Sequence, residues 1–305
     1  MPRPSKPSGN LYLVLKSLNM LTLRNTWFED GHKFVRWSPD TSSLLKHVKT
    51  VLSDQLKPYL SRRCSHIKDH GGVKLSVRYS QRLCNHFGYV ARFDVRSYYK
   101  SMDHQIILNL LRQYNVTPAV IGIVSEYLSH PDHSNTGKGM VAGGAISPLI
   151  GALYLTPLDK LMEGLHASLG IHYQRYMDDY VIFAPTRHKL RKAIRRMHAV
   201  LDDLKVKIHP KKRFIGPTRR GFDFLGYWLE PHKLLTPSQV SLSRLIDRSR
   251  QLQKRTASII RLRRYVQRWL LWHHSGLRGW TAKGSGFKWV WQYVTTALKF
   301  NRQSV

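Results

Sequence analysis

The amino-acid sequence predicts an α+β fold, with a mainly antiparallel sheet followed by an all-helical C-terminal segment. Residues 173–184 place aromatic and β-branched side chains on both sides of Asp178 and Asp179, which is typical of a β-hairpin with acid at its tip. Residues 89–94 form a second apolar stretch, which ends in Asp94. From Pro237 onward, apolar residues recur at helical spacing among many arginines. Central strands and terminal helices together indicate the α+β class.

The composition indicates that the protein binds a polyanion. The chain has 305 residues, 42% of them apolar, which is enough to bury one large or two modest cores. Its 50 lysine and arginine residues against 18 aspartate and glutamate residues give a formal net charge of +32. Charge of this size favours nucleic acid, because neutralising phosphates releases counterions.

A membrane surface is the other common polyanion, but the sequence argues against it. No apolar run reaches about 18 residues, and the N-terminus lacks the apolar core of a signal peptide. Cys64 and Cys84 have no zinc-type spacing, which indicates free thiols in a cytoplasmic protein. The 16 histidines show no metal-binding pattern and favour neutral polar or phosphate-facing roles.

Residues 1–59 are predicted to form a helical extension. Residues 1–9 are rich in proline, serine and basic residues and are expected to be disordered. Apolar residues then recur at helical spacing over 11–23, which predicts a helix. Packing is one role for it, and the family resemblance described below implies the other, contact with the fingers or the template. The aromatic residues of 27–37 favour core packing over base stacking, and 43–59 is a further helix.

Gly71 and Gly72 predict a tight turn between two strands. In such a strand Lys74 and Arg78 point to the same face, from which both could reach a triphosphate. Two solvated charges on an exposed strand are the alternative.

The middle of the chain alternates helices with glycine-containing loops. Asp103 is a predicted N-cap for the helix that follows it. Gly143 and Gly144 permit a close backbone approach to a nucleotide or template, or else a core-packing turn. A helix is expected over 147–162, and another over 189–204 covers the sheet with a basic face, for which solvation is favoured over a nucleic-acid role.

The last third contains a strand pair and the basic helices. Residues 222–229 are predicted to form two strands with Gly226 at the bend. Helices are expected over 237–305, where the tryptophans at 272, 280, 289 and 291 favour burial over stacking on bases.

Three carboxylates carry the expected chemistry. Two Mg²⁺ ions about 3.5–4 Å apart need bridging acidic oxygens, with phosphates and water as further ligands. Asp94 at a strand end and Asp178 with Asp179 at a hairpin tip could supply them. An ordinary Asp-Asp turn is the alternative for the pair alone.

These boxes resemble those of bacterial retroelement-type reverse transcriptases, a group that includes group II intron-like, retron, diversity-generating and phage-defence enzymes. The similarity covers roughly residues 60–235. Its boxes, in chain order, are GGVKLSVR at 71–78, DVRSYY at 94–99, GGAISP at 143–148, YMDD at 176–179, HPKKR at 209–213 and GFDFLGY at 221–227. Single boxes are weak signals, whereas boxes in the same order and spacing are a strong one. The family often has Gln where this chain has Ala142, which affects how that loop would touch a nucleotide.

The resemblance implies a right-hand polymerase, with fingers and palm at 60–235 and a basic helical thumb at 236–305. It implies catalytic roles for Asp94, Asp178, Asp179 and Lys212, metal binding by Asp94, Val95, Asp178 and Asp179, nucleotide binding by Lys74, Arg78, Val95, Tyr99 and Gly143, and a primer grip at Phe224, Leu225 and Gly226. The implied cofactor is a pair of Mg²⁺ ions, for which Mn²⁺ could substitute. Tyr99 would lie beneath the incoming sugar, or pack in the core while Tyr98 faces outward.

The implied reaction is RNA-directed DNA synthesis from deoxynucleoside triphosphates on a structured noncoding RNA, in a setting such as phage defence. About 70 residues follow the primer-grip box, which leaves no room for a nuclease domain and disfavours an intron mobility protein. The alternatives are a template-independent or RNA-copying polymerase and a polymerase-derived RNA-binding protein. Template identity, priming and oligomeric state stay open.

Overall fold

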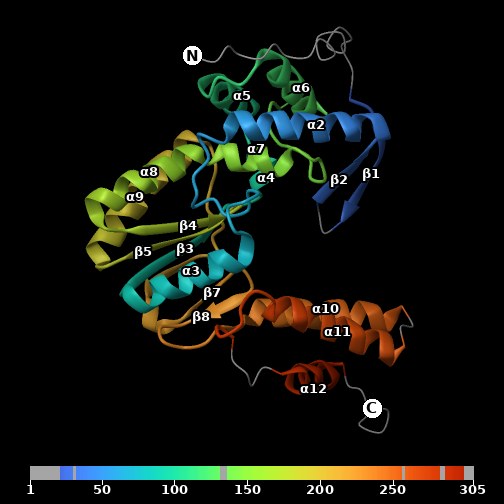
Figure 1. Ribbon diagram of the computed structural model, residues 1–305, viewed down its shortest axis with the longest axis vertical. Helices are drawn as coiled ribbons and strands as arrows, with labels where there is room; N and C mark the ends of the chain where they lie inside the picture. The colour runs from blue at the N-terminus through green and yellow to red at the C-terminus, as the bar shows by residue number, and fades with distance from the viewer. Residues whose placement is uncertain (1–20, 30–31, 131–135, 256–257, 282–285, 299–305) are drawn as a thin grey trace, which may run out of the picture.

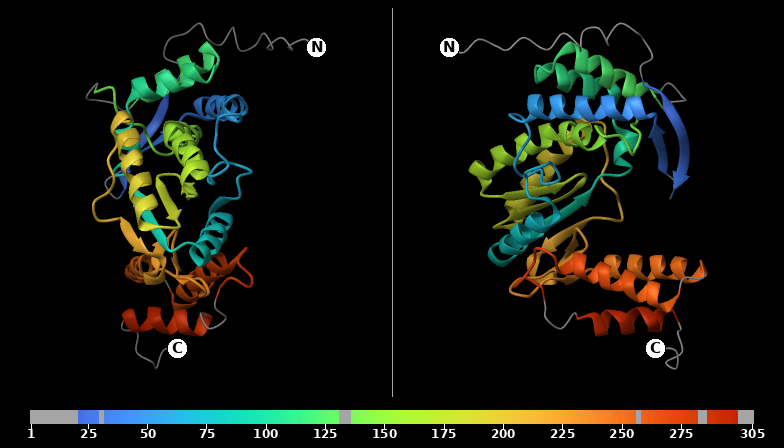
Figure 2. Two further views of the ribbon diagram at one scale, coloured as in Figure 1. Left: turned by 90° about the vertical axis from the view of Figure 1, so that its left-hand side faces the viewer. Right: turned by 45° about the vertical axis from the view of Figure 1, so that its right-hand side comes forward.

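The computed structural model describes residues 21–29, 32–130, 136–255, 258–281 and 286–298 (Figure 1). These residues form three antiparallel sheets and a set of helices, so the predicted α+β class is confirmed. The early helices lie at one end of the molecule and the C-terminal helices at the other, with the largest sheet between them (Figures 1 and 2). None of the helices in the described ranges is both long and apolar enough to cross a membrane.

The first described residues form a β-hairpin. β1 (Leu23–Glu29) pairs antiparallel with β2 (His32–Trp37), and the buried side chains of Val35 and Trp37 join the main core. The predicted helical character of residues 1–59 is therefore wrong for this part. Thr26, Val35 and Trp37 in these strands are β-branched or aromatic, and such residues favour a pleated strand over a helix.

The two helices predicted for residues 1–59 have different outcomes. α2 (Pro39–Leu56) corresponds to the helix expected over 43–59, and it begins where Ser38 Oγ accepts a hydrogen bond from the Thr41 N–H at 3.2 Å. The helix expected over 11–23 lies outside the described residues except at its end.

Gly71 and Gly72 begin a helix and do not connect two strands. α3 (Gly72–His86) follows Gly71, whose φ of 91° lies in the left-handed region. Its buried positions are Ser76, Val77, Ser80, Gln81, Leu83 and Cys84. The predicted strand is wrong because this spacing buries one face of a helix, whereas a strand would bury every second residue. Lys74 and Arg78 still share a face, since residues four apart are neighbours on a helix as well.

The largest sheet has the strand order β4-β5-β3-β6, with every neighbouring pair antiparallel. Its strands are β3 (Tyr89–Asp94), β4 (His172–Tyr176), β5 (Asp179–Ala184) and β6 (Phe214–Pro217). The hairpin predicted for 173–184 is confirmed as β4 and β5, and the strand predicted for 89–94 is confirmed as β3.

The two faces of this sheet pack against different cores. Ala91 belongs to the main core, on the face covered by α9 (Arg187–Asp203), whereas Val90 belongs to a second core formed with α3 and the small sheet described below. Residues two apart on a strand share a face, so Asp94 lies on the face of Val90. Asp179 is its register partner on β5 and lies on that face too.

Among the described residues, five helices connect β3 to β4 and contribute to the main core. They are α4 (Tyr98–Ser101), α5 (His104–Gln113), α6 (Pro118–Ser129), α7 (Ser147–Tyr154) and α8 (Thr156–Leu169). Asp103 Oδ1 accepts from the Ile106 N–H at 3.2 Å, which confirms the predicted N-cap. The helix predicted over 147–162 divides at Leu155, because Pro157 has no N–H to continue a helix and fits only a first turn.

A small sheet follows the short helix η1 (Thr218–Arg220). Its strands are β7 (Phe222–Phe224), β8 (Tyr227–Leu229) and β9 (Thr236–Pro237). Leu225 and Gly226 both have positive φ, 50° and 86°, as a two-residue hairpin turn requires. The strand pair predicted at 222–229 is confirmed.

The C-terminal layer is all-helical, as predicted. It consists of α10 (Gln239–Lys254), α11 (Ile259–His274) and α12 (Phe287–Ala297), packed around Leu245, Leu262, Val266, Val290 and Val294. Of its tryptophans, Trp291 is buried, but Trp272 and Trp289 are 52% and 44% exposed, so their predicted burial is wrong. The three domains inferred from the sequence, at 1–59, 60–235 and 236–305, stay predictions.

Candidate active site

The hairpin tip brings three carboxylates together at one end of the sheet. Asp94 lies opposite Asp179 in the register of β3 and β5, and Asp178 precedes Asp179 at the turn. Met177 has a φ of 57°, so the turn takes a left-handed conformation there. The Val95 N–H donates to the Asp178 carbonyl at 3.2 Å, which ties the end of β3 to the tip.

Asp179 is held by an arginine that the sequence analysis did not single out. Arg92 Nε and Nη2 donate to the two carboxylate oxygens of Asp179 at 3.1 and 2.9 Å, and Nη1 reaches Asp223 Oδ1 at 3.2 Å. The side chains of Arg92 and Asp179 are only 12% and 16% exposed. This two-point pair fixes the Asp179 carboxylate. Its position in the sequence could have indicated this role, because Arg92 precedes Asp94 by two residues and therefore lies on the same face of the strand.

Burial and like charge disfavour ionisation of the acids at the tip. Burial raises the pKa of Asp179 to about 6, and the ion pair with Arg92 opposes that rise only in part. Burial and the neighbouring Asp94 carboxylate raise the pKa of Asp178. A cation placed between these groups would relieve both effects.

The acids fit a metal site that a substrate completes. Within the described ranges, no group of three or more histidine, cysteine, aspartate or glutamate side chains forms a metal cage. Four carboxylates line the cleft, and Arg92 pairs with two of them, Asp179 and Asp223. Asp94 and Asp178 are the two that Arg92 does not hold. Magnesium is commonly held by one or two carboxylates, with substrate phosphates and water as the other ligands. Asp94 and Asp178 meet that requirement.

A buried ion pair supports the hairpin from below. Arg175 Nε donates to Asp159 Oδ1 at 2.8 Å, and the two side chains are 0% and 2% exposed. Arg175 Nη1 donates to the Met177 carbonyl at 2.9 Å. The pair thus fixes the residue that sets the turn.

His66 supports the same turn from the other side. Its Nδ1 accepts from the Met177 N–H at 3.0 Å, and its Nε2 lies 3.0 Å from the Pro148 carbonyl. An imidazole that accepts at Nδ1 donates at Nε2, so both contacts need the neutral ring. Burial lowers the pKa of His66 to about 4, which keeps the ring neutral at physiological pH.

A cleft of about 560 Å³ lies over the carboxylates. The strand ends and the β7–β8 turn at 225–226 form one wall, and α10 and α11 form the other wall, which contributes Arg244 and Arg248. Lys212 Nζ lies 3.6 Å from Asp94 Oδ1 with its side chain half exposed. An acidic floor that faces basic side chains is suited to a phosphorylated chain with metal ions beneath it.

Lys74 and Arg78 are not among the residues that line this cleft, although Lys74 contacts Trp272, which does line it. Lys74 Nζ donates to the carbonyls of Trp272 and His273 at 2.6 and 3.1 Å, in the last turn of α11. Burial lowers the pKa of Lys74 to about 8. Arg78 lines a separate cavity of about 200 Å³ together with the arginines at 62–63.

The glycine loop before α7 is shaped by packing. A Cβ on Gly144 would lie 2.0 Å from Tyr127 Oη, which supports the core-packing alternative for that residue. Gly143 is exposed with a φ of 96°, and Ala142 is half-buried beside it. Neither residue lines the cleft.

The remaining candidate residues differ in how far their side chains are buried. Val95 and Phe224 are buried, so their side chains serve the core. Tyr98 is buried and donates to the Gly151 carbonyl at 2.6 Å, whereas Tyr99 is only partly buried. The alternative with Tyr98 facing outward is therefore wrong.

Three comparisons relate the chain to known proteins. A family profile described as reverse transcriptase (RNA-dependent DNA polymerase) matches residues 36–229. A comparison with curated protein sequences finds no match. Among solved structures, apo telomerase from Candida tropicalis superimposes with a TM-score of 0.53 at 11% identity, covering 86% of this chain and 52% of that one.

Telomerase from Candida albicans, in complex with a fragment of telomeric RNA, superimposes with a TM-score of 0.51 at 10% identity. The match covers 86% of this chain and 55% of that one, so the chain spans about half the length of these telomerases. Likeness at this identity concerns the fold alone.

Proposed function

The chain belongs to the reverse transcriptase family of RNA-dependent DNA polymerases, and we propose that it copies an RNA template into DNA by nucleotidyl transfer. One observation carries the proposal. Asp94 and Asp178 meet at the floor of a cleft with basic residues on the facing wall, inside the part of the chain that matches the family.

In this proposal the sheet β4-β5-β3-β6 is the palm, and α10–α12 form the thumb. The fingers come from the segments before and after β3 within residues 60–235, and the β1–β2 hairpin and α2 belong to the N-terminal extension. The primer end would lie between the β7–β8 turn and the strand ends, where Phe224 holds the turn in the core while Leu225 and Gly226 line the cleft.

The chemistry follows from which groups line the cleft. Two bound Mg²⁺ ions, or Mn²⁺ in their place, would activate a primer hydroxyl and stabilise negative charge on the departing pyrophosphate. Asp94 and Asp178 would hold them, with the Val95 backbone alongside. Asp179, fixed by Arg92, would orient its neighbour, and Lys212 would donate a proton to the pyrophosphate. Tyr99 would contact the incoming sugar.

Lys74, Arg78, Tyr99 and Gly143 are the less supported nucleotide contacts, because none of them lines the cleft as it stands. They retain that role in the proposal only if binding of the triphosphate changes the position of α3, of α4 or of the loop before α7.

We expect Asp94→Asn to abolish Mg²⁺-dependent extension of a primed RNA template while folding and RNA affinity stay nearly unchanged. Asn keeps the side-chain shape but removes the charge that a metal requires, so the loss falls on the transition state. Asp203→Asn, at the exposed end of α9, is the matched control and should extend primers at the wild-type rate.

The alternatives predict different results. Extension by Asp94→Asn near the wild-type rate contradicts the site. A wild-type enzyme that adds nucleotides without a template, or prefers ribonucleotides, indicates another polymerase reaction on the same fold. Binding without any synthesis indicates an RNA-binding protein.

The template class we propose is a dedicated structured noncoding RNA of a bacterial retroelement, used in the cytoplasm in a setting such as phage defence. It is supported by the motif resemblance and by the net charge of +32. Sequencing the nucleic acids that copurify with the protein tests it. One abundant structured RNA with complementary DNA is the expected result, and a random sample of cellular RNA contradicts it.

A further inference from the structure

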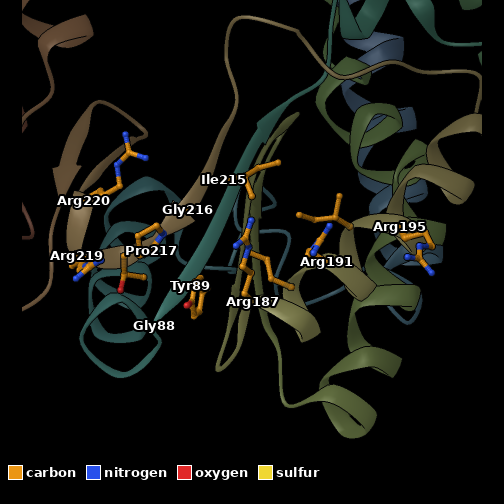
Figure 3. A pocket seen from close by; sticks show the side chains of 13 residues that line it. Gly88, Tyr89, Arg187, Arg191, Arg195, Ile215, Gly216, Pro217, Arg219 and Arg220 are labelled. Carbon is orange, nitrogen blue, oxygen red and sulfur yellow. The ribbon is translucent and has the colours of Figure 1, made fainter.

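A second basic groove lies between α9 and the edge strand β6. Its volume is about 1080 Å³, roughly twice that of the cleft over the carboxylates. It is lined by Arg187, Arg191 and Arg195 of α9 and by Arg219 and Arg220 of η1, and Figure 3 shows these side chains spread from one end of the groove to the other. No acidic residue lines it.

These arginines have no role in holding the fold together. Across the part of the chain that the structure describes, none of the five side chains forms a salt bridge or a hydrogen bond. Structural arginines in this protein look different, since Arg92 and Arg175 are both paired with aspartates. Five guanidinium groups gathered without counter-charge repel one another and are available to an anionic ligand.

The groove is separate from the proposed active site. It reaches Tyr89 at the start of β3, whereas Asp94 ends that strand about 17 Å away at roughly 3.3 Å per residue. It also adjoins α9, which covers the sheet face opposite to that of Asp94. A primer–template seated over Asp94 would therefore leave the groove unoccupied.

We propose that this groove binds the sugar–phosphate backbone of a helical RNA segment outside the polymerase cleft. Arg187, Arg191 and Arg195 are four residues apart, so they form a stripe spaced by about 6 Å, comparable with the separation of successive phosphates along a strand. The guanidinium fork matches phosphate oxygens in pairs.

Two features favour helical RNA over other anions. Interfaces with nucleic acid are much more positively charged than those between proteins, and this groove carries one sign of charge only. Tyr89 is the one aromatic side chain among the lining residues, whereas single strands are usually held on several stacking aromatics. The inference goes beyond the proposed polymerase reaction and does not depend on catalysis.

The test uses the full-length protein with the cleft saturated by a short unlabelled primer–template. A labelled RNA hairpin of about ten base pairs is titrated over a range of salt concentrations. Arg191→Gln with Arg195→Gln should weaken hairpin binding by about tenfold and lower the log–log salt slope by about 1.5, since each lost phosphate contact removes roughly 0.7–0.9.

Lys192→Gln with Arg196→Gln is the matched control, with the same helix, spacing and charge loss at exposed positions that do not line the groove. It should bind the hairpin nearly as the wild type does. Both double variants should melt at the wild-type temperature and extend the short primer–template normally. Arg219→Gln with Arg220→Gln, on the other wall, should repeat the binding loss.

Three results would overturn the proposal. One is an equal loss in both α9 double variants, which indicates non-specific attraction. Another is competition between hairpin and primer–template for one site. The third is binding of a polyglutamate peptide to the groove, with the arginine variants lowering the affinity for the peptide and not the affinity for RNA. That result indicates an acidic protein partner. All three results are measured as binding. A failure of the polymerase assignment is measured as primer extension, so the two failures can be told apart.

Discussion

At the level of single residues, burial disfavours the ionised form of Asp179. Its pKa rises from an ordinary 3.8 to about 6, chiefly through burial. Between those values the native state binds more protons than the unfolded chain does. This carboxyl group therefore makes folding less favourable as the pH rises from 3.8 to about 6, and Asp179→Asn should remove that part of the pH dependence of unfolding.

The same shift predicts an acid limit for activity. We expect the rate of primer extension to fall by about tenfold per pH unit once the pH is below about 6. A protonated Asp179 loses its charge-assisted pair with Arg92, and the neighbouring Asp178, whose pKa is also raised, loses affinity for metal. Single-turnover rates from about pH 5 to pH 8 measure this, and a flat profile contradicts it.

Tyr99 allows a second test at this scale. Its ring is partly buried and packs near Gly151, with Tyr98 fixed in the core beside it. If Tyr99 lies beneath the incoming sugar, Tyr99→Ala should raise ribonucleotide use relative to deoxyribonucleotide use by about tenfold or more, because a steric clash in a packed site is lost. The measurement is the ratio of the two kcat/KM values on one primed template.

The matched control is Tyr98→Phe, which removes a buried hydrogen bond to Gly151 and keeps the ring. It should lower stability without altering sugar choice. An unchanged ratio in Tyr99→Ala removes that residue from the nucleotide site.

At the level of elements, the hairpin β4–β5 depends on the ion pair beneath it. We expect Arg175→Met to destabilise the protein by about 3–5 kcal/mol, because it leaves the Asp159 carboxylate buried without its partner. The double variant Arg175→Met with Asp159→Leu should recover much of that stability, since neither buried charge remains.

Measuring the extension rate distinguishes a role of Arg175 in positioning the turn from a role in stability alone. The double variant lacks the hydrogen bond from Arg175 to the Met177 carbonyl, so its extension rate should stay low at a temperature where it is fully folded. Denaturant unfolding and extension assays on the same preparations give both values. A stable and fully active double variant contradicts the positioning role.

Sequence patterns predicted the elements whose local signal was unambiguous. Runs of aromatic and β-branched residues beside carboxylates indicated the hairpin and β3, and a spacing of three to four residues indicated the C-terminal helices; all are found. α3 was missed because Gly71 and Gly72 suggested a turn, and because a spacing of four between Lys74 and Arg78 suits a strand and a helix equally.

The supporting contacts of the site were not predictable in the same way. Arg175 and Asp159 are 16 positions apart and come together only because α8 packs on β4. His66 reaches Met177 across 111 positions. The sequence indicated the three carboxylates through a local motif, whereas the groups that support the turn depend on tertiary contacts with no local pattern.

At the level of the whole molecule, polar contacts at the end of α11 help to attach the C-terminal layer to the rest, beside the apolar packing of Leu277. The Tyr227 hydroxyl donates to the His273 carbonyl at 2.7 Å, and Lys74 donates to the same carbonyl and to that of Trp272. Lys74 also lies over the Trp272 ring at 4.1 Å. A cation at the C-terminus of α11 is favoured by the helix dipole. These contacts set the position of the basic wall opposite Asp94.

That position makes the basic wall testable by salt dependence. We expect Arg244→Gln with Arg248→Gln, the two α10 arginines that line the cleft, to weaken primer–template binding and to lower its log–log salt slope by about 1.5. Each arginine that contacts a phosphate releases a counterion on binding, so its removal reduces the slope regardless of sequence. Titrations at several salt concentrations give the slope.

The matched control is Arg250→Gln with Lys254→Gln, also on α10 and four residues apart but outside the cleft lining. If net charge alone attracted nucleic acid, both variants would lose the same affinity, since each removes two of 50 basic residues. A loss confined to the cleft variant instead requires that the phosphates lie between α10 and the carboxylates. That geometry would bring the primer end to Asp94, as nucleotidyl transfer at this site requires.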